Sequence, residues 1–297
     1  EQSLANESFS ATAFASMATQ DAVDNAPQPG QFVPRRPESL EDAGLQLNDL
    51  FPLILKYLFL HGNRSGHQLS KQLKMPFDFI VPAMDSLKSD LLVVHKASAG
   101  MMTDYEYELT PKGIEQARIH LARSTYCGSA PVSIAEYQNA VLRQSIRNLK
   151  PRFKDVASAL SDLEVTELTV NQMGQAINSG KSMFLFGAPG NGKTSLAKRA
   201  INAIGNELWI PRAITVGGEV IRMFDPSVHK PLPLPETTGL TDEDNIDHRW
   251  IRIERPTIVV GGELEMKHLE ATLNPVTGII EAPIHVKSNC GCLVVDD

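Results

Sequence analysis

Apolar residues in the first half of the chain recur at the spacing of helices. Leu47–Leu60 is strongly apolar and predicts a helix, and a shorter helix over His67–Lys74 follows it. Pro76 separates that helix from a third one. The third helix carries apolar residues at spacings of four, three and four, namely Ile80, Met84, Leu87 and Leu91.

A hairpin and a closing helix come next. Leu92–His95 and the alternating Tyr105–Leu109 predict two paired strands. Thr110 and Pro111 then supply the N-cap and the first residue of a last helix. Three helices, a hairpin and a closing helix are the order of a winged helix, and the sequence from Tyr107 to Ile114 resembles the end of the wing in many bacterial winged-helix proteins. We therefore expect a small α+β winged-helix-like domain over residues 44–125.

The charges of this domain bear on whether it reads DNA. Nine basic residues are opposed by eight acidic ones, and the third helix carries Asp78, Asp85 and Asp90 against Lys88 alone. Such a helix suits the phosphates of duplex DNA poorly. The interpretation we favour is a docking site for a protein partner, with DNA binding as the alternative.

A phosphate-binding motif stands in the second half of the chain. The short apolar run Ser182–Phe186 predicts a buried parallel strand. It leads into Gly187–Thr194, which matches G-x-x-x-x-G-K-[ST], and a good helix-forming segment follows. Lys193 would reach the β- and γ-phosphates, and the Thr194 hydroxyl would be a ligand of Mg²⁺. The predicted cofactors are ATP and Mg²⁺, and the predicted nucleotide-binding residues are Gly187, Ala188, Pro189, Gly190, Asn191, Gly192, Lys193, Thr194 and Ser195.

An acidic pair follows a second apolar run at Cys292–Val295. An acid at the carboxyl end of a parallel strand lies beside the phosphate loop. Asp296 would therefore hold Mg²⁺ together with Thr194. Asp297 would orient the attacking water and act with Lys193 as a catalytic residue.

The loop Gly-Ala-Pro-Gly-Asn-Gly-Lys-Thr resembles that of the AAA superfamily, in which a Pro commonly precedes the middle Gly. From about residue 40 onward the chain also resembles a little-described group of bacterial AAA-type ATPases. The matching segments are Leu50–Leu60, Gly187–Ala197, Phe224–Pro226, Asp247–Trp250, Val259–Glu263 and Glu281–Pro283.

The resemblance implies an α/β P-loop NTPase fold, with a parallel sheet and helices, over residues 164–297. It also implies nucleotide-dependent remodelling and a homo-oligomeric ring. Asp297 departs from the family pattern, because AAA enzymes usually have Glu there. The sensor, arginine finger and helical lid of the family follow this strand. We therefore expect the front part of an ATP hydrolase, truncated after the acidic strand, that binds ATP·Mg²⁺ but turns it over weakly.

The remaining segments are expected to connect these parts. Residues 1–43 form a flexible tether rich in Ser, Ala, Gln and Pro, 126–163 a helical connector, and about 212–285 a long insert. Within the insert, Arg249, Arg252 and Arg255 alternate on an expected strand. This pattern favours a solvated face, with the lining of a pore or subunit surface as the alternative. Two other functions stay open: an ATP-switched DNA-binding regulator, and a P-loop phosphotransferase whose insert forms the acceptor pocket.

Composition limits the partners and the cellular compartment that we expect. The net charge of −7 and pI of about 5.7 argue against broad affinity for nucleic acid or anionic membranes. No run of 18 apolar residues occurs, so no membrane span is expected. Three cysteines, two of them at Cys290 and Cys292 without a zinc-site partner pair, fit a reducing compartment and a cytoplasmic location.

Overall fold

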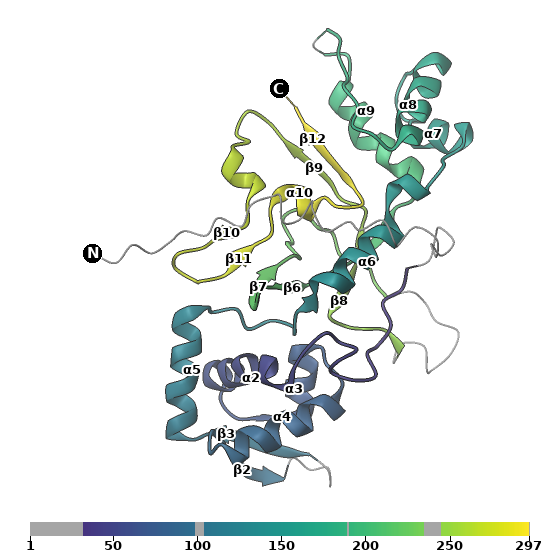
Figure 1. The fold of residues 1–297 in the computed structure, drawn as a ribbon. Helices are drawn as coiled ribbons and strands as arrows, with labels where there is room; N and C mark the ends of the chain where they lie inside the picture. Colours follow the sequence, from purple (N-terminus) through teal and green to yellow (C-terminus); the bar gives the residue numbers. More distant parts are fainter. Residues whose placement is uncertain (1–31, 99–103, 189, 235–244, 297) are drawn as a thin grey trace.

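The computed structural model of the chain describes residues 32–98, 104–188, 190–234 and 245–296. The helices and hairpin expected between residues 44 and 125 are confirmed (Figure 1). They are α2 (Leu47–His61), α3 (Gly66–Leu73), α4 (Phe77–Ser89), β2 (Val93–Ser98), β3 (Tyr105–Leu109) and α5 (Pro111–Arg123). A two-residue strand, β1 (Arg64–Ser65), completes an antiparallel sheet of order β1-β3-β2.

Local sequence explains where these helices begin. The Ser65 hydroxyl accepts the N–H of Gln68, and the Thr110 hydroxyl accepts the N–H of Gly113, so both helices have capped first turns. The apolar faces meet in one core in which the side chains of Leu50, Ile54, Leu69, Leu73, Ile80, Met84 and Leu87 are fully buried. Leu91 is the exception. It lies beyond the end of α4 with a φ of 59° and is 68% exposed, so its expected place on the apolar face of that helix is wrong.

Short strands form the middle of the molecule (Figure 1). A five-stranded sheet has the order β10 (Thr272–Leu273), β11 (Ile280–Glu281), β7 (Glu219–Arg222), β6 (Ala213–Val216) and β4 (Val132–Ser133). An antiparallel pair joins β5 (Glu207–Pro211) to β8 (Trp250–Glu254). A parallel pair joins β9 (Thr257–Val260) to β12 (Cys292–Val295). Most of these strands come from the expected insert, which is therefore a folded part of the molecule.

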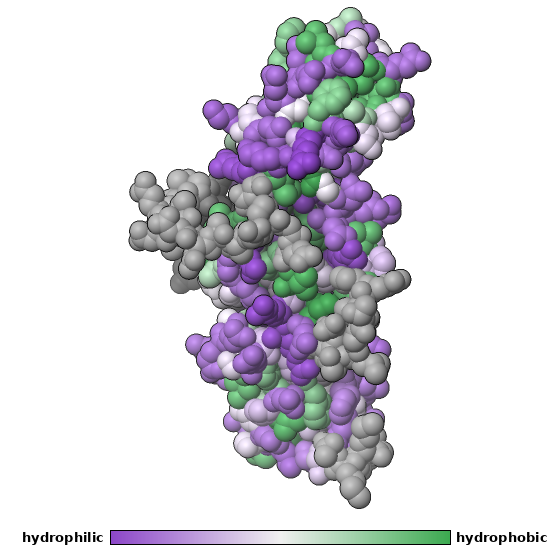
Figure 2. Space-filling model, turned by 90° about the vertical axis from the view of Figure 1, so that its right-hand side faces the viewer, coloured by the Kyte–Doolittle hydropathy of each residue, from purple (hydrophilic) through white to green (hydrophobic). Residues whose placement is uncertain are grey.

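The remaining helices lie outside the winged-helix elements. They are α6 (Ile134–Gln144), α7 (Phe153–Ala159), α8 (Glu167–Ser179), α9 (Lys193–Ala200) and α10 (Ile284–Lys287), with 3₁₀ turns η2 (Ile146–Asn148), η3 (Ile201–Ile204) and η5 (Met266–Leu269). Of these, α10 lies among the strands in the middle of the molecule (Figure 1). Figure 1 shows α7, α8 and α9 at the end opposite α5. Their shared core is small, and Figure 2 shows apolar residues among polar ones on the surface at this end. No helix in the described ranges is both long and apolar enough to cross a bilayer.

A buried arginine joins the first domain to the middle of the molecule. Arg249 is 1% exposed, and its guanidinium donates to both carboxylate oxygens of Asp247 at 2.7–3.1 Å. It also donates to the carbonyl oxygens of Ala43 at 2.8 Å and Pro131 at 3.1 Å. The expected solvated face is therefore wrong for Arg249, because the segments of Ala43, Pro131 and Asp247 close around it.

The run Ser182–Phe186 is not a strand in this structure. Phe184 is 86% exposed and Phe186 is 85% exposed. An apolar run becomes a strand only where a neighbour takes up its backbone hydrogen bonds, and within the described residues β12 is paired on β9 alone. The expected buried strand is therefore wrong for this segment, and the parallel sheet of a P-loop NTPase as a whole stays a prediction.

Candidate nucleotide-binding site

The loop at Gly187–Thr194 leads directly into α9, whose first residue is Lys193. Gly190 and Gly192 have φ angles of 85° and 73°, which side-chain-bearing residues adopt only with strain. A Cβ built on either glycine meets no atom within 4 Å. The space over the loop is therefore open, and the N–H groups at the start of α9 are available to an anion.

Lys193 lies across its own loop. Its ammonium donates to the carbonyl oxygens of Gly187 at 3.1 Å and Ala188 at 3.2 Å. These carbonyl oxygens are neutral acceptors, and an ammonium forms stronger hydrogen bonds with a negatively charged acceptor. A phosphate oxygen bound in the loop could therefore replace them as the partner of Lys193.

The structure brings Thr194 and Asp296 together although they are 102 positions apart in the chain. The Thr194 hydroxyl donates to Asp296 Oδ2 at 2.7 Å. Asp296 follows the last residue of β12, and its N–H donates to the carbonyl oxygen of Val260 at 2.8 Å, which continues the ladder with β9. The parallel pair β9–β12 thus delivers the carboxylate to the first turn of α9.

The other predicted site residues in the described part of the chain form no contact that assigns them a role. Ala188 and Asn191 are exposed, and Ser195 is half-buried on α9. Pro189 and Asp297 lie outside the described residues, so the expected role of Asp297 in orienting water stays a prediction.

Glu263, for which the sequence predicts no role, also lies at this edge of the parallel pair, just after β9. Its carboxylate accepts the N–H of Gly261 at 2.8 Å, and a Cβ built on Gly261 lies 3.5 Å from the carbonyl oxygen of Asp296. Hydrogen bonds from backbone N–H groups lower the pKa of Glu263, so the carboxylate is kept ionised. The sequence feature that could have identified Glu263 is its position: an acidic residue directly after the Gly-Gly turn that ends a predicted strand.

Arg255 ties the phosphate-loop side to the acidic strand. Its guanidinium donates to the carbonyl oxygens of Gly205 at 2.9 Å and Glu207 at 3.4 Å, and also to that of Cys290. Gly205 follows η3, which continues α9, and Cys290 shortly precedes β12. Arg255 is half-buried, so the expected solvated face holds only in part, and burial lowers the pKa of its guanidinium.

A second buried charge cluster holds the segment that leads into β12. Lys287 of α10 is 8% exposed, and its ammonium contacts Asp225 at 2.7 Å and Glu281 at 3.4 Å. His229 accepts the N–H of Asp225 at 3.1 Å through Nδ1, so Nε2 donates to the carbonyl oxygen of Lys287 at 2.9 Å. This cluster fixes α10 against the loop that follows β7.

The oxygen donors at Thr194 and Asp296 fit Mg²⁺, which prefers hydroxyl, carboxylate and phosphate oxygens. Within the described parts of the chain no group of three or more His, Cys, Asp or Glu side chains could hold a metal ion. Mg²⁺ characteristically takes only one or two carboxylates and completes its shell with phosphates and water.

Comparisons with known proteins name no family. No family model and no curated protein matches the chain. Among solved structures, a mutant of Lactococcus lactis ZitR in apo form is 19% identical, with 25% of this chain and 55% of that chain covered and a TM-score of 0.23. Reduced AbfR bound to DNA is 15% identical, with 27% and 57% covered and a TM-score of 0.22. The match thus spans little more than half of each of those chains, and TM-scores this low carry no argument about function.

Proposed function

We propose that this protein is an ATPase that binds ATP with Mg²⁺ between the loop Gly187–Thr194 and Asp296. The observation that carries the proposal is the 2.7 Å hydrogen bond from the Thr194 hydroxyl to the Asp296 carboxylate. An oxygen pair beside a glycine-rich loop and a helix start is the arrangement that nucleotide sites use for the metal and the phosphates.

Each side chain has a definite task in this proposal. The amides at the start of α9 bind phosphate oxygens, assisted by the positive end of the helix. Lys193 exchanges its two loop carbonyls for β- and γ-phosphate oxygens. Thr194 and Asp296 hold the metal, which when bound neutralises phosphate charge. Hydrolysis would then drive remodelling or assembly of a partner, in a homo-oligomeric ring as the resemblance to AAA-type ATPases implies.

The partner that we propose for the winged-helix-like domain is a protein. Asp78, Asp85 and Asp90 are all exposed on or just after α4, and Lys88 is the one exposed base among them. A helix with this charge repels the phosphates of a major groove. DNA binding is the alternative, and it predicts an affinity for duplex that falls steeply with salt.

Nucleotide binding is tested by titrating the chain with a fluorescent ATP analogue, with and without Mg²⁺. Lys193→Ala is expected to abolish binding. Thr194→Ala and Asp296→Asn are expected to remove the part of the affinity that depends on Mg²⁺, about tenfold or more. Lys198→Ala is the matched control, because Lys198 is an exposed lysine on the same helix. Equal binding by the parent chain and Lys193→Ala would refute the site.

Two further measurements separate the alternatives. Malachite-green assay of free phosphate, with mass spectrometry of the products, distinguishes a hydrolase from a phosphotransferase, which leaves a phosphorylated acceptor instead. Titration of a labelled DNA duplex at two salt concentrations tests the winged-helix-like domain. Salt-sensitive binding that is lost in Lys71→Gln or Lys88→Gln would replace the protein-docking proposal with DNA binding.

A further inference from the structure

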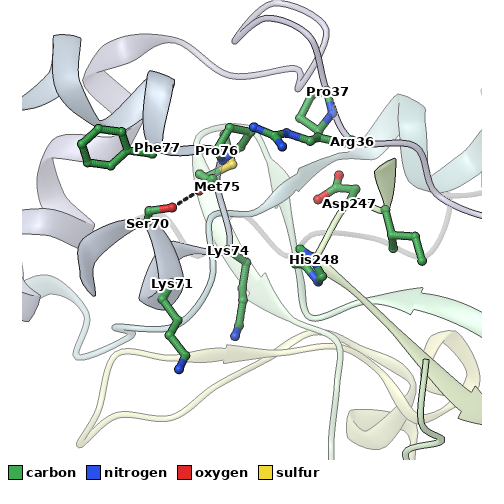
Figure 3. A pocket seen from close by; sticks show the side chains of 11 residues that line it. Arg36, Pro37, Ser70, Lys71, Lys74, Met75, Pro76, Phe77, Asp247 and His248 are labelled. Carbon is green, nitrogen blue, oxygen red and sulfur yellow. Dashed lines mark hydrogen bonds between the residues drawn. The ribbon is translucent and has the colours of Figure 1, made fainter. Parts of the chain in front are cut away.

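A cavity of about 400 Å³ lies where the first domain meets the middle of the molecule (Figure 3). Three segments wall it: the turn between α3 and α4, residues 36–37, and residues 246–248. Small-molecule sites have volumes of roughly 300–1,000 Å³, so the cavity is large enough for a small ligand. It lies away from the phosphate loop, none of whose residues line it.

The walls are held in place by hydrogen bonds that need no ligand. The Ser70 hydroxyl donates to the carbonyl oxygen of Met75 at 2.6 Å and fixes the turn after α3. Residues 34–36 pair with residues 245–247 through two backbone hydrogen bonds of 2.7 and 3.1 Å. The cavity is therefore preformed, which lowers the entropic cost of binding.

Positive charge gathers at this cavity without a matching carboxylate. Arg36, Lys71 and Lys74 line it, and within the described residues none of the three forms an ion pair. Asp247 also lines the cavity, but Arg249 already binds both of its carboxylate oxygens. Figure 3 shows the side chains of Lys71, on α3, and Lys74, just after it, extending the same way, with Arg36 on the other side of the turn.

The most enclosed of these cations is Lys74, which is half-buried. Burial lowers the pKa of Lys74, and the positive charges of Arg212 and Lys71 lower it further. A half-buried ammonium beside other cations is destabilised until an anion arrives. Met75, Pro76 and Ile246 supply an apolar wall beside the charged groups.

We propose that this cavity binds a small phosphate-bearing molecule, with Lys74, Lys71 and Arg36 meeting its charge and the apolar wall receiving its organic part. Such a ligand would contact both the turn between α3 and α4 and the segment next to Arg249. It would therefore stabilise the junction between the winged-helix elements and the rest of the chain, independently of ATP.

The test uses the Lys193→Ala chain, so that the phosphate loop no longer contributes. Inorganic pyrophosphate is titrated into it by isothermal calorimetry at low ionic strength without Mg²⁺. Saturable binding at one site is expected, weakened about tenfold by Lys74→Met, because a charged hydrogen bond is lost. Lys88→Met is the control, since Lys88 is exposed on α4 away from the cavity.

Several outcomes would overturn the proposal. These are the absence of saturable binding, equal affinity in Lys74→Met, or an equal loss in Lys88→Met, which would mean non-specific attraction. Where a melting curve shows that Lys74→Met is unfolded, Lys71→Gln replaces it, because Lys71 is exposed and its loss leaves the core intact. Failure here leaves the ATP site untouched, since Lys193 is already removed.

Discussion

Replacing Arg249 by Met leaves the buried Asp247 carboxylate without its charged partner, with the backbone N–H of residue 249 as a remaining donor. Arg249 and Asp247 are 1% and 2% exposed, so the stranded carboxylate has little access to water. Breaking a buried pair in this way costs about 3–5 kcal/mol of unfolding free energy. The loss of donors to the carbonyl oxygens of Ala43 and Pro131 acts in the same direction.

The assay is urea unfolding followed by tryptophan fluorescence. Both tryptophans of the chain, Trp209 and Trp250, belong to one buried cluster next to this ion pair, so their emission reports on the same region. The matched control is Arg123→Met, because the Arg123 side chain is 75% exposed in its pair with Glu219. An exposed pair is worth below about 1 kcal/mol, and the control should lose no more than that.

A double variant separates the charge effect from loss of packing. Arg249→Met combined with Asp247→Leu removes the buried carboxylate as well and leaves only the half-buried Glu136, 3.5 Å from the guanidinium in the parent chain, without its cationic partner. The double variant should therefore be more stable than Arg249→Met alone. The reasoning is refuted if Arg249→Met loses no more than the exposed control. It is also refuted if the double variant loses the sum of the two single losses.

Three other predictions concern separate parts of the molecule. Burial would raise the pKa of Asp225, but hydrogen bonds from Lys287 and Ser227 outweigh it and hold the pKa well below its usual range. The ionised Asp225 carboxylate therefore contributes its full stabilisation above the unfolded pKa of about 4, and this stabilisation is lost as the pH falls towards the pKa of the folded state. The melting temperature of Asp225→Asn should accordingly fall less on acidification than that of the parent chain, as a series of melting curves at decreasing pH would show. Arg255→Lys keeps the positive charge but loses the three hydrogen bonds that the guanidinium donates to the carbonyl oxygens of Gly205, Glu207 and Cys290. In a nucleotide titration it should weaken Mg²⁺-dependent ATP binding more than the control Arg252→Lys does. Gly278 and Gly217 both have φ near 60°, but only at Gly278 would a Cβ meet a carbonyl oxygen, that of Arg123, at 2.1 Å. In urea unfolding, Gly278→Ala should therefore lower the unfolding free energy by about 1–3 kcal/mol more than Gly217→Ala does.

The first domain could be predicted from sequence because its elements are local. The helices and the hairpin follow from apolar spacing and from caps such as Ser65 and Thr110, all within a few residues of the element that they start. The apolar periodicity gives a wrong prediction for Leu91, because the helix ends at Ser89 and the backbone of Leu91 adopts the left-handed conformation.

The candidate site could be predicted in its parts. The loop and the acid are recognisable motifs, and Asp296 does lie beside the first turn of α9 as expected. The expected arrangement of parallel strands around the loop is not what places it there, because Ser182–Phe186 is not a strand and β12 is paired with β9. Arg249 and Arg255 could not be placed in the same way. Alternation along a strand shows which residues share a face, but the segments that cover that face come from distant parts of the chain. Nothing near Arg249 in sequence points to Ala43 or Pro131.

The separation of Thr194 and Asp296 by 102 positions has a consequence for the order of events during synthesis. At about 5–20 residues per second, the loop leaves the ribosome roughly 5–20 s before the carboxylate that it contacts. During that interval Lys193 and Thr194 exist without Asp296, and a nucleotide cannot be clamped between them. Under the proposed function, tight Mg²⁺-dependent binding would therefore begin only after the strands between the two residues have been made, and nucleotide binding would report that this part of the chain is complete.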